Sequence, residues 1–419
     1  MVLLRSIVPV LSTLGLLLCL SSGAAARPGV EGEAPPRKPL QVFILAGQSN
    51  MQGHAELRTI DAMTLDPHTA ELLPLMRDAA GEPRVCERVW INSLGSAPEV
   101  RTGPLTVGFG AQGRQPKFGP EFTFGLYAEK LLDAPILIIK TAWGGKSLHT
   151  DFRPPSAGPF ILGERARAEL EKKGADVEAA QAERTRASGV YYRAMMEHIR
   201  EVLSEIETAV PGYDRTLGHE LAGFVWFQGW NDMVASDVYP QRDRAGGYDL
   251  YSDLLTTFIR DVRRDLSSPK LPFVIGVLGV GGPLEQYPPD SQRYKGVHGN
   301  FRRAMAAPAS LREFRGTVLA VETAPFWDQR VAALREREKK LRPRFDQLKK
   351  EVEAGTRTPA EAKAERERIF EETFNDEERV LLLESVSNGD YHYMGSARVI
   401  APIGRAFAEA AATLVRRSR

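Results

Sequence analysis

The residues Gly47-Gln48-Ser49-Asn50-Met51 place a serine directly after an apolar run, on a turn that contains glycine. Such a turn presents the Ser49 hydroxyl to a substrate, and the backbone N–H groups beside it can hold a negatively charged oxygen. A serine hydroxyl is a weak nucleophile and needs a neighbouring base. The G-x-S-x-G pattern of α/β-hydrolases is absent, because Met51 stands where its second glycine is required. A helix N-cap is the structural alternative for this serine.

Two further glycine-containing segments follow later apolar runs. The segment Trp143-Gly144-Gly145-Lys146-Ser147 lacks the first glycine of a nucleotide-binding P-loop, since Lys140 occupies that position. Its paired glycines can instead expose a backbone N–H to a close ligand. The segment Phe227-Gln228-Gly229-Trp230-Asn231-Asp232 offers amide side chains that could donate hydrogen bonds to an oxyanion.

A histidine near the C-terminus is the candidate base for the serine. His392 lies in Asn388-Gly389-Asp390-Tyr391-His392-Tyr393, just before the last predicted helix. His54 competes for this role, because it follows Ser49 closely along the chain. No two histidines have the spacing of a zinc protease site, and cysteine is nearly absent. We therefore expect no catalytic metal.

Taken together and in this order, GQSNM, WGGKSL, FQGWND and YHYMGSA resemble the SGNH-hydrolase superfamily. Within it they are most similar to the branch of sialate O-acetylesterases and acetyl-xylan esterases, the sixth carbohydrate esterase family. The resemblance covers roughly residues 40–414. It implies a three-layer α/β/α flavodoxin-like fold, hydrolysis of acetyl esters on sugars, and no cofactor.

The resemblance also implies a role for each motif. Ser49 would be the nucleophile, and His392 would be its base and then the acid for the leaving sugar hydroxyl. The oxyanion hole would be drawn from backbone N–H groups and amide side chains: Ser49, Gly145 (or Gly144), Asn231 and Gln228. The branch more often has Gln-Gly-Glu in the third motif, and Trp230 departs from it, so the choice between Asn231 and Gln228 stays open.

The third member of a catalytic triad is open as well. The superfamily usually has an aspartate three residues before the histidine, but Gly389 stands there in this chain. Asp390 could orient His392, Asp232 could do so from the third motif, or a backbone carbonyl could serve a Ser–His dyad. Three aromatic residues could stack on sugar faces, with core packing as the alternative: Trp143, Trp230 and Tyr393.

The elements that must position these residues alternate between strands and helices. Short runs apolar on both faces are typical of parallel strands covered by helices, and five such runs occur: residues 40–46, 134–141, 222–227, 272–278 and 317–321. Helical patterns lie between them, at residues 121–132, 191–206, 248–265 and 397–415. This alternation predicts a three-layer α/β domain over residues 39–416, with its ligand at the carboxyl ends of the strands.

Two charged segments do not fit this alternation. Residues 164–186 are rich in alanine and glutamate, and more than half of residues 328–379 are charged. We expect helical insertions in both, the second a hairpin broken near residues 355–359. Their mixed charge signs make a binding surface of one sign unlikely, so a solvated insertion is favoured over a lid or a partner-binding arm.

The N-terminus predicts export. Residues 7–20 are almost wholly apolar, Arg5 precedes them, and alanines at 24–26 suit a cleavage site, which together predict a signal peptide over residues 1–26. A proline-rich leader would occupy 27–38. The mature protein would be secreted or periplasmic, without stable membrane insertion, although an uncleaved anchor is the alternative. The near balance of 55 basic and 54 acidic residues argues against nucleic acid as a partner.

An acetylated carbohydrate is therefore the predicted substrate, but two other functions compete. A catalytically silent carbohydrate-binding protein on the same fold would bind sugars without releasing acetate. An esterase for non-sugar esters would keep the Ser–His chemistry and prefer another substrate.

Overall fold

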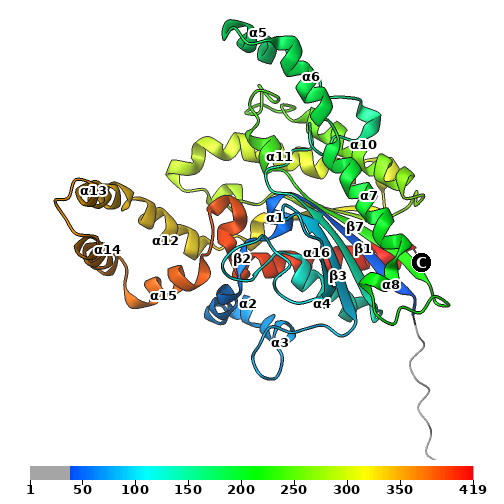
Figure 1. Cartoon of the computed structure of the whole chain (residues 1–419), viewed down its shortest axis with the longest axis horizontal. Coiled ribbons are helices and arrows are strands. Elements are labelled where there is room, and N and C mark those ends of the chain that lie inside the picture. Colours follow the sequence, from blue (N-terminus) through cyan, green and yellow to red (C-terminus); the bar gives the residue numbers. More distant parts are fainter. Residues whose placement is uncertain (1–37, 419) are drawn as a thin grey trace, which may run out of the picture. The chain divides into compact units, whose positions relative to one another are not determined.

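The computed structural model describes residues 38–418, and a seven-stranded sheet forms its centre (Figure 1). The strand order is β4-β3-β6-β1-β7-β8-β9, and every neighbouring pair is parallel except β3 and β4. The strands are β1 (Leu40–Gly47), β3 (Val89–Gly95), β4 (Arg101–Pro104), β6 (Ile136–Ala142), β7 (His219–Phe227), β8 (Phe273–Val277) and β9 (Val318–Glu322).

The five strands β6-β1-β7-β8-β9 have the flavodoxin-like order 2-1-3-4-5 when they are numbered along the chain. They are the five runs that the sequence predicts. The strands β3 and β4 are not predicted, and they extend the sheet beyond β6. The predicted α/β fold with a parallel sheet is confirmed.

Helices cover both faces of the sheet because its strands are apolar on both sides. On one face, Trp226 and Phe224 of β7 pack against Phe258 of α10, with ring centroids 4.5 and 5.9 Å apart. On the other face, Phe227 packs against Phe407 of α16 at 5.2 Å. The main covering helices are α4 (Glu121–Leu132), α7 (Val190–Ser204), α10 (Asp249–Asp265), α11 (Lys295–Ala306) and α16 (Ala397–Ser418). Smaller helices are α2 (Pro67–Ala70), α3 (Leu73–Met76), α8 (Ile206–Ala209) and α9 (Trp230–Val234).

Short elements gather at the carboxyl ends of the strands. Helix α1 (Ser49–Gln52) follows β1 almost at once, and the two-residue strands β2 (Ala55–Glu56) and β5 (Lys117–Phe118) pair antiparallel. The 3-10 helix η8 (Asp390–Gly395) directly precedes α16. These elements carry the serine and histidine motifs to the same edge of the sheet.

Both charged segments are helical, as Figure 1 shows. The first holds α5 (Glu164–Lys172) and α6 (Val177–Ala187), and the second holds α12 (Gln329–Lys339), α13 (Arg342–Glu353), α14 (Pro359–Thr373) and α15 (Asp376–Ser385). We call residues 329–385 the helical arm. Within it α13 packs on α14 and α12 on α15, and ion pairs Arg330–Glu377 and Arg337–Glu378 join the latter two.

The N-terminal predictions fall largely outside the described residues. The signal peptide (1–26) and all of the leader except Lys38 belong to residues 1–37, which the structure does not describe. The described residues, 38–418, form one compact unit. Across the part that is described, none of the helices combines the length and the apolar character that crossing a bilayer requires.

Candidate active site

The nucleophile candidate Ser49 is the first residue of α1, at the carboxyl end of β1. Gly47 makes this turn possible, because a Cβ there would lie 2.2 Å from the carbonyl oxygen of Phe227. Ser49 is buried, with 7% of its surface exposed. Within residues 38–418 its hydroxyl has no hydrogen-bond partner, so it is not used as a cap. The side chain is thus available for chemistry.

The segment η8 brings His392 against α1, although Ser49 and His392 are far apart along the chain. The backbone of η8 is unusual, since Tyr393 (φ 52°) and Met394 (φ 61°) both adopt left-handed conformations. Non-glycine residues avoid this region unless surrounding contacts impose it, and such strain is concentrated at functional sites. One such contact is made by Ser387, whose Oγ donates to the carbonyl oxygen of Gly395 at 2.6 Å.

Asn388, which the sequence analysis did not single out, fixes the tautomer of His392. Its Oδ1 accepts the N–H of Gly389 at 2.8 Å, which identifies this atom as the oxygen of the amide. The same Oδ1 lies 2.8 Å from Nδ1 of His392, so Nδ1 must carry the proton. Nε2 is then unprotonated and can accept the proton of a serine hydroxyl.

His392 is half-buried, and burial is the main reason why its pKa falls to about 4, with the positive charge of Lys117 adding to the effect. The imidazole is therefore neutral at neutral pH, which is the state that a general base needs.

Asp390 does not lie where the predicted role of orienting His392 would require. Its carboxylate faces the helical arm, with Oδ2 2.5 Å from Nζ of Lys339 and Oδ1 3.4 Å from Nε of Arg335. Asn388 takes the place at Nδ1 of His392 instead. Asp390 is therefore not the residue that orients the base.

The carboxylate of the alternative acid, Asp232, is also hydrogen-bonded to groups other than His392. It is fully buried and accepts the backbone N–H groups of Leu148 and His149 at 2.7 and 3.0 Å. It also accepts the Tyr239 hydroxyl at 3.0 Å and the side-chain amide of Gln228 at 2.6 Å. Gln228 is equally buried, so neither residue is free for the roles predicted for them. Both hold the segment after β6 in place.

Asn231 remains the candidate for the side-chain amide of the oxyanion hole. Gln48 accepts two backbone N–H groups at its Oε1, from Gly229 at 3.0 Å and from Asn231 at 3.4 Å. Its Nε2 must therefore be the donor, and it donates to Oδ1 of Asn231 at 2.9 Å. Nδ2 of Asn231 is left without a partner among the described residues. Gln48, the residue before Ser49, thus orients the side chain of Asn231 with its Nδ2 as a free donor within residues 38–418.

Of the two adjacent glycines, Gly144 lies nearer to Ser49 than Gly145, which the sequence favoured. A Cβ at Gly144 would lie 3.9 Å from Cβ of Ser49, whereas a Cβ at Gly145 would meet nothing within 4 Å. Gly144 is therefore the glycine that lies against the nucleophile. Its N–H donates to Oγ of Ser96 at 3.0 Å. Gly145, the first choice from the sequence, is exposed on this turn with φ 74°.

The family model described as carbohydrate esterase, sialic acid-specific acetylesterase, matches residues 39–299. The chain belongs to this family. It is a carbohydrate esterase, which hydrolyses ester bonds. The match includes Ser49, the paired glycines and Asn231, and His392 lies beyond its end.

Three solved structures match parts of this chain. A protein from Arabidopsis thaliana has 18% identity and a TM-score of 0.36, over 68% of this chain and 86% of its own. A carbohydrate acetylesterase from Xanthomonas citri has 11% identity and a TM-score of 0.36, over 67% of this chain and 49% of its own. NanS has 18% identity and a TM-score of 0.36, over 70% of this chain and 79% of its own. No curated protein matches the sequence.

The aromatic residues near the esterase's site separate into buried and exposed ones. Trp143 is buried against Phe152 and Tyr191, and Tyr393 is fully buried. The hydroxyl of Tyr393 is hydrogen-bonded to Gly279 and Thr323. Both residues therefore pack in the core, which was the alternative to stacking on sugars.

At the rim, half-buried Trp230 lies beside Tyr391, with ring centroids 5.9 Å apart. Tyr391 is 47% exposed and also contacts His392, at 4.4 Å. The sequence analysis missed Tyr391.

A buried ion pair supports the end of α1. Nζ of Lys140 lies 2.8 Å from Oε2 of Glu121, and both side chains are almost completely buried. The same ammonium donates to the carbonyl oxygens of Gln52 at 2.8 Å and Phe109 at 3.0 Å. Burial lowers the pKa of Lys140, while Glu121 opposes that shift. Removing one partner would leave an uncompensated charge beneath the nucleophile turn.

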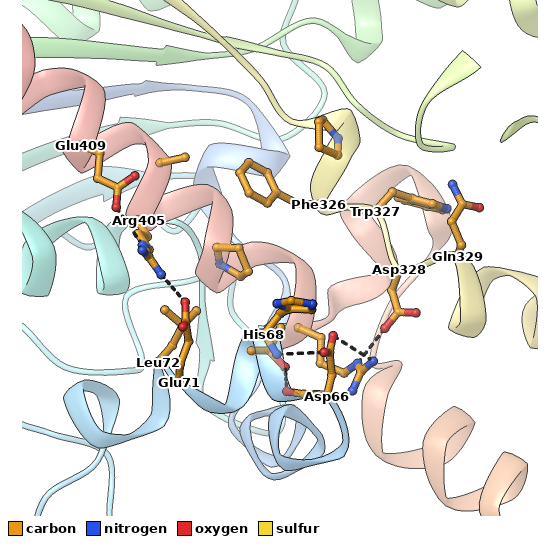
Figure 2. A pocket seen from close by; sticks show the side chains of 15 residues that line it. Asp66, His68, Glu71, Leu72, Phe326, Trp327, Asp328, Gln329, Arg405 and Glu409 are labelled. Atoms are coloured by element: carbon orange, nitrogen blue, oxygen red, sulfur yellow. Dashed lines mark hydrogen bonds and ion pairs between the residues drawn. The ribbon is translucent and has the colours of Figure 1, made fainter. Parts of the chain in front are cut away.

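A pocket of about 600 Å³ lies between α2, residues 325–329 and α16 (Figure 2). None of the motif residues discussed above lines it. Buried Arg398 lines this pocket. Its guanidinium donates to Oδ2 of Asp328 at 2.7 Å and forms an ion pair with Asp66 at 3.6 Å. Asp328 also caps the first helix of the arm, so these contacts attach the arm to the domain. Among residues 38–418, no group of three potential metal ligands occurs.

Proposed function

We propose that this carbohydrate esterase removes acetyl groups from sugars by acyl transfer through Ser49 and His392. The observation that supports it best is the pairing of His392 with Asn388 in a loop that lies against the nucleophile helix. That pairing leaves an unprotonated ring nitrogen on the loop that contacts α1, and the Ser49 hydroxyl of α1 has no other partner among the described residues, as a base and a nucleophile require.

The reaction would proceed in two steps. Ser49 Oγ attacks the acetyl carbonyl carbon while Nε2 of His392 takes its proton. Asn231 Nδ2 and the N–H of Ser49 hold the oxyanion, and Gly144 lies close enough to shape the same space. His392 then returns the proton to the leaving sugar oxygen. His392 then takes a proton from water, which attacks the acetyl-enzyme, and returns that proton to Ser49 Oγ as the ester bond breaks and acetate leaves.

The paired rings of Trp230 and Tyr391 suit a sugar as the leaving group. Aromatic faces at the rim of a site pack against the apolar face of a pyranose, and Tyr391 touches the base itself. Sialic acid and acetylated polysaccharide both remain candidates. We also propose that the enzyme is exported, on the sequence pattern of residues 1–26.

The decisive experiment compares wild type with Ser49→Ala on p-nitrophenyl acetate and on a panel of acetylated glycans. We expect the variant to fold, to release no acetate and to resist labelling by an organophosphonate ester. Acetate release by Ser49→Ala would refute the nucleophile. Sugar binding by wild type without acetate release or labelling would indicate a silent binding protein. Faster turnover of longer acyl esters would indicate a non-sugar substrate.

A further inference from the structure

The ring of His54 lies flat on the ring of His392. The two centroids are 3.8 Å apart and the planes differ by only 4°. His54 lies between α1 and β2, so the nucleophile turn itself supplies the ring that covers the base. The Nε2 atom of His54 is buried and has no hydrogen-bond partner within residues 38–418. The proposed reaction uses His392 and leaves this second histidine without a role.

Asn388 connects both rings. Because its Oδ1 accepts from Gly389 and His392, its Nδ2 is a donor, and it lies 3.4 Å from Nδ1 of His54. His54 then accepts at Nδ1 and carries its proton on Nε2, the opposite tautomer to His392. The backbone that follows His54 is held as well, since the N–H of Glu56 donates to the Ser387 hydroxyl at 3.2 Å.

The charges around the stacked pair keep both rings neutral. The pKa of His54 falls to about 3, through burial first and then through His392, Lys117 and Lys140. His392 faces Lys117 and the ring of Tyr391. Two imidazolium rings at stacking distance would repel each other, so when His392 takes a proton during the reaction, His54 must stay neutral.

Asp390, the acid nearest to His392 along the chain, pairs with Lys339 and Arg335. Glu56, the acid nearest to His54, pairs with Arg58 at 3.1 Å.

We propose that His54 is a positioning residue for His392, an inference that rests on the proposed function. Its neutral ring covers one face of the base, keeps water from that face and fixes the plane of the imidazole. It makes no contact with the reacting atoms. The stacked ring is thus one of the groups that bury His392, and its loss should expose the base to water and raise the pKa of His392.

The test measures kcat and KM for p-nitrophenyl acetate between pH 4 and pH 8, per active site labelled with an organophosphonate. For His54→Ala we expect kcat to fall about 10- to 100-fold, a loss smaller than that of a general base, with little change in KM. The pKa of His392, which sets the acidic limb of the pH profile, should rise from about 4 toward 6.5. His54→Phe keeps a flat ring in this place. It should therefore retain the low pKa of the acidic limb and most of the wild-type kcat.

A matched control is His198→Ala, which removes a buried imidazole from α7. It should lower thermal stability without moving the acidic limb. If His54→Ala does not fold, long-range ¹H–¹⁵N NMR of the wild type gives an independent answer. His54 should then remain neutral with its proton on Nε2 down to about pH 4, and His392 should carry its proton on Nδ1.

Several results would overturn the inference alone. These are a wild-type rate and pH profile for His54→Ala, an NMR titration showing His54 protonated near pH 6, or loss of all activity in both His54 variants while His392→Ala stays active. The last would make His54 the base. By contrast, acetate release by Ser49→Ala would remove the proposed function itself, whatever the His54 variants do.

Discussion

Replacing Asn388 by alanine removes the only side-chain acceptor at Nδ1 of His392 within the described residues. In the resting enzyme that hydrogen bond joins two neutral groups and contributes about 0.5–1.5 kcal/mol. In the transition state the ring becomes a cation, and a hydrogen bond from a charged donor is worth about 1.5–3 kcal/mol. The base also loses the group that selects its tautomer. The transition state therefore loses more than the ground state.

The difference between these two ranges sets the expected size of the effect. A net loss of about 1–1.5 kcal/mol in the transition state relative to the resting enzyme lowers kcat/KM about 5- to 13-fold, since about 1.4 kcal/mol corresponds to a factor of ten. Asn388→Ala also removes the cap on the N–H of Gly389, which should lower the melting temperature by at most about 2–4 °C. Acetate release and thermal melting, measured on the same sample, separate the two effects.

Asn388→Asp is the matched variant, because it keeps an acceptor at the same position and adds a charge. A carboxylate beside an imidazole favours the protonated ring, so the pKa of His392 should rise from about 4 by about one to three units. The base must be neutral to act, so activity is lost as pH falls through this higher pKa, and the acidic limb moves up. At pH 8 the variant should retain at least the wild-type rate. An unchanged limb in Asn388→Asp, or full activity in Asn388→Ala, would refute the pairing on which the proposed site depends.

Two other changes test the remaining parts of the site. Asn231→Ala removes the proposed oxyanion donor and should lower kcat by about 10²–10³-fold with little effect on KM, whereas a loss confined to KM would assign Asn231 to substrate binding instead. Arg335→Ala combined with Lys339→Ala frees Asp390 from the arm and should lower kcat by no more than about two- to thirtyfold at neutral pH, because the two partly exposed ion pairs are worth about 0.4–2 kcal/mol together. Lys349→Ala, which breaks an exposed pair elsewhere in the arm, is the control and should leave kcat unchanged.

The five main strands could be predicted from the sequence because helices cover them on both faces. A strand covered by helices on both faces is apolar at most positions, and residues 42–46 of β1 and 136–139 of β6 carry that signal as continuous apolar runs. The strand β3 has Asn92 and Ser93 in its second half and pairs at the sheet's edge with β4, so it gives no comparable run. β3 lies between β4 and β6, and Asn92 and Ser93 are buried polar residues that interrupt its apolar pattern.

The site was harder to predict than the fold, because its chemistry depends on which atoms meet. Ser49, His392 and Asn231 could be named from motif order, but the orienting group could not, since Asn388 is an amide one residue away from the expected aspartate position. An asparagine before a glycine, in the loop of the candidate base, was the available signal. Gln228 looked like an oxyanion donor until the buried carboxylate of Asp232 accounted for its amide.

The pair Tyr391 and Tyr393 shows why the catalytic loop defeats simple periodicity. In an extended loop, residues two apart point to the same side, so a sugar-stacking role for one would extend to the other. Here the backbone turns left-handed at Tyr393 and Met394, which sends Tyr391 outward and Tyr393 into the core. Such conformations cost about 1–3 kcal/mol each.

Contacts from outside the loop offset that cost. The Tyr393 hydroxyl lies 2.8 Å from the N–H of Gly279, just after β8, and 2.7 Å from Oγ1 of Thr323, just after β9. Burying its ring against Phe227 and Trp327 adds a stabilisation of about 1.5–3 kcal/mol, comparable to one left-handed residue. The loop that holds His392 is therefore shaped by strands β7, β8 and β9 together with the helical arm that binds Asp390. Because those groups come from distant parts of the chain, the geometry of the base follows from the tertiary fold and cannot be read from the loop's own sequence.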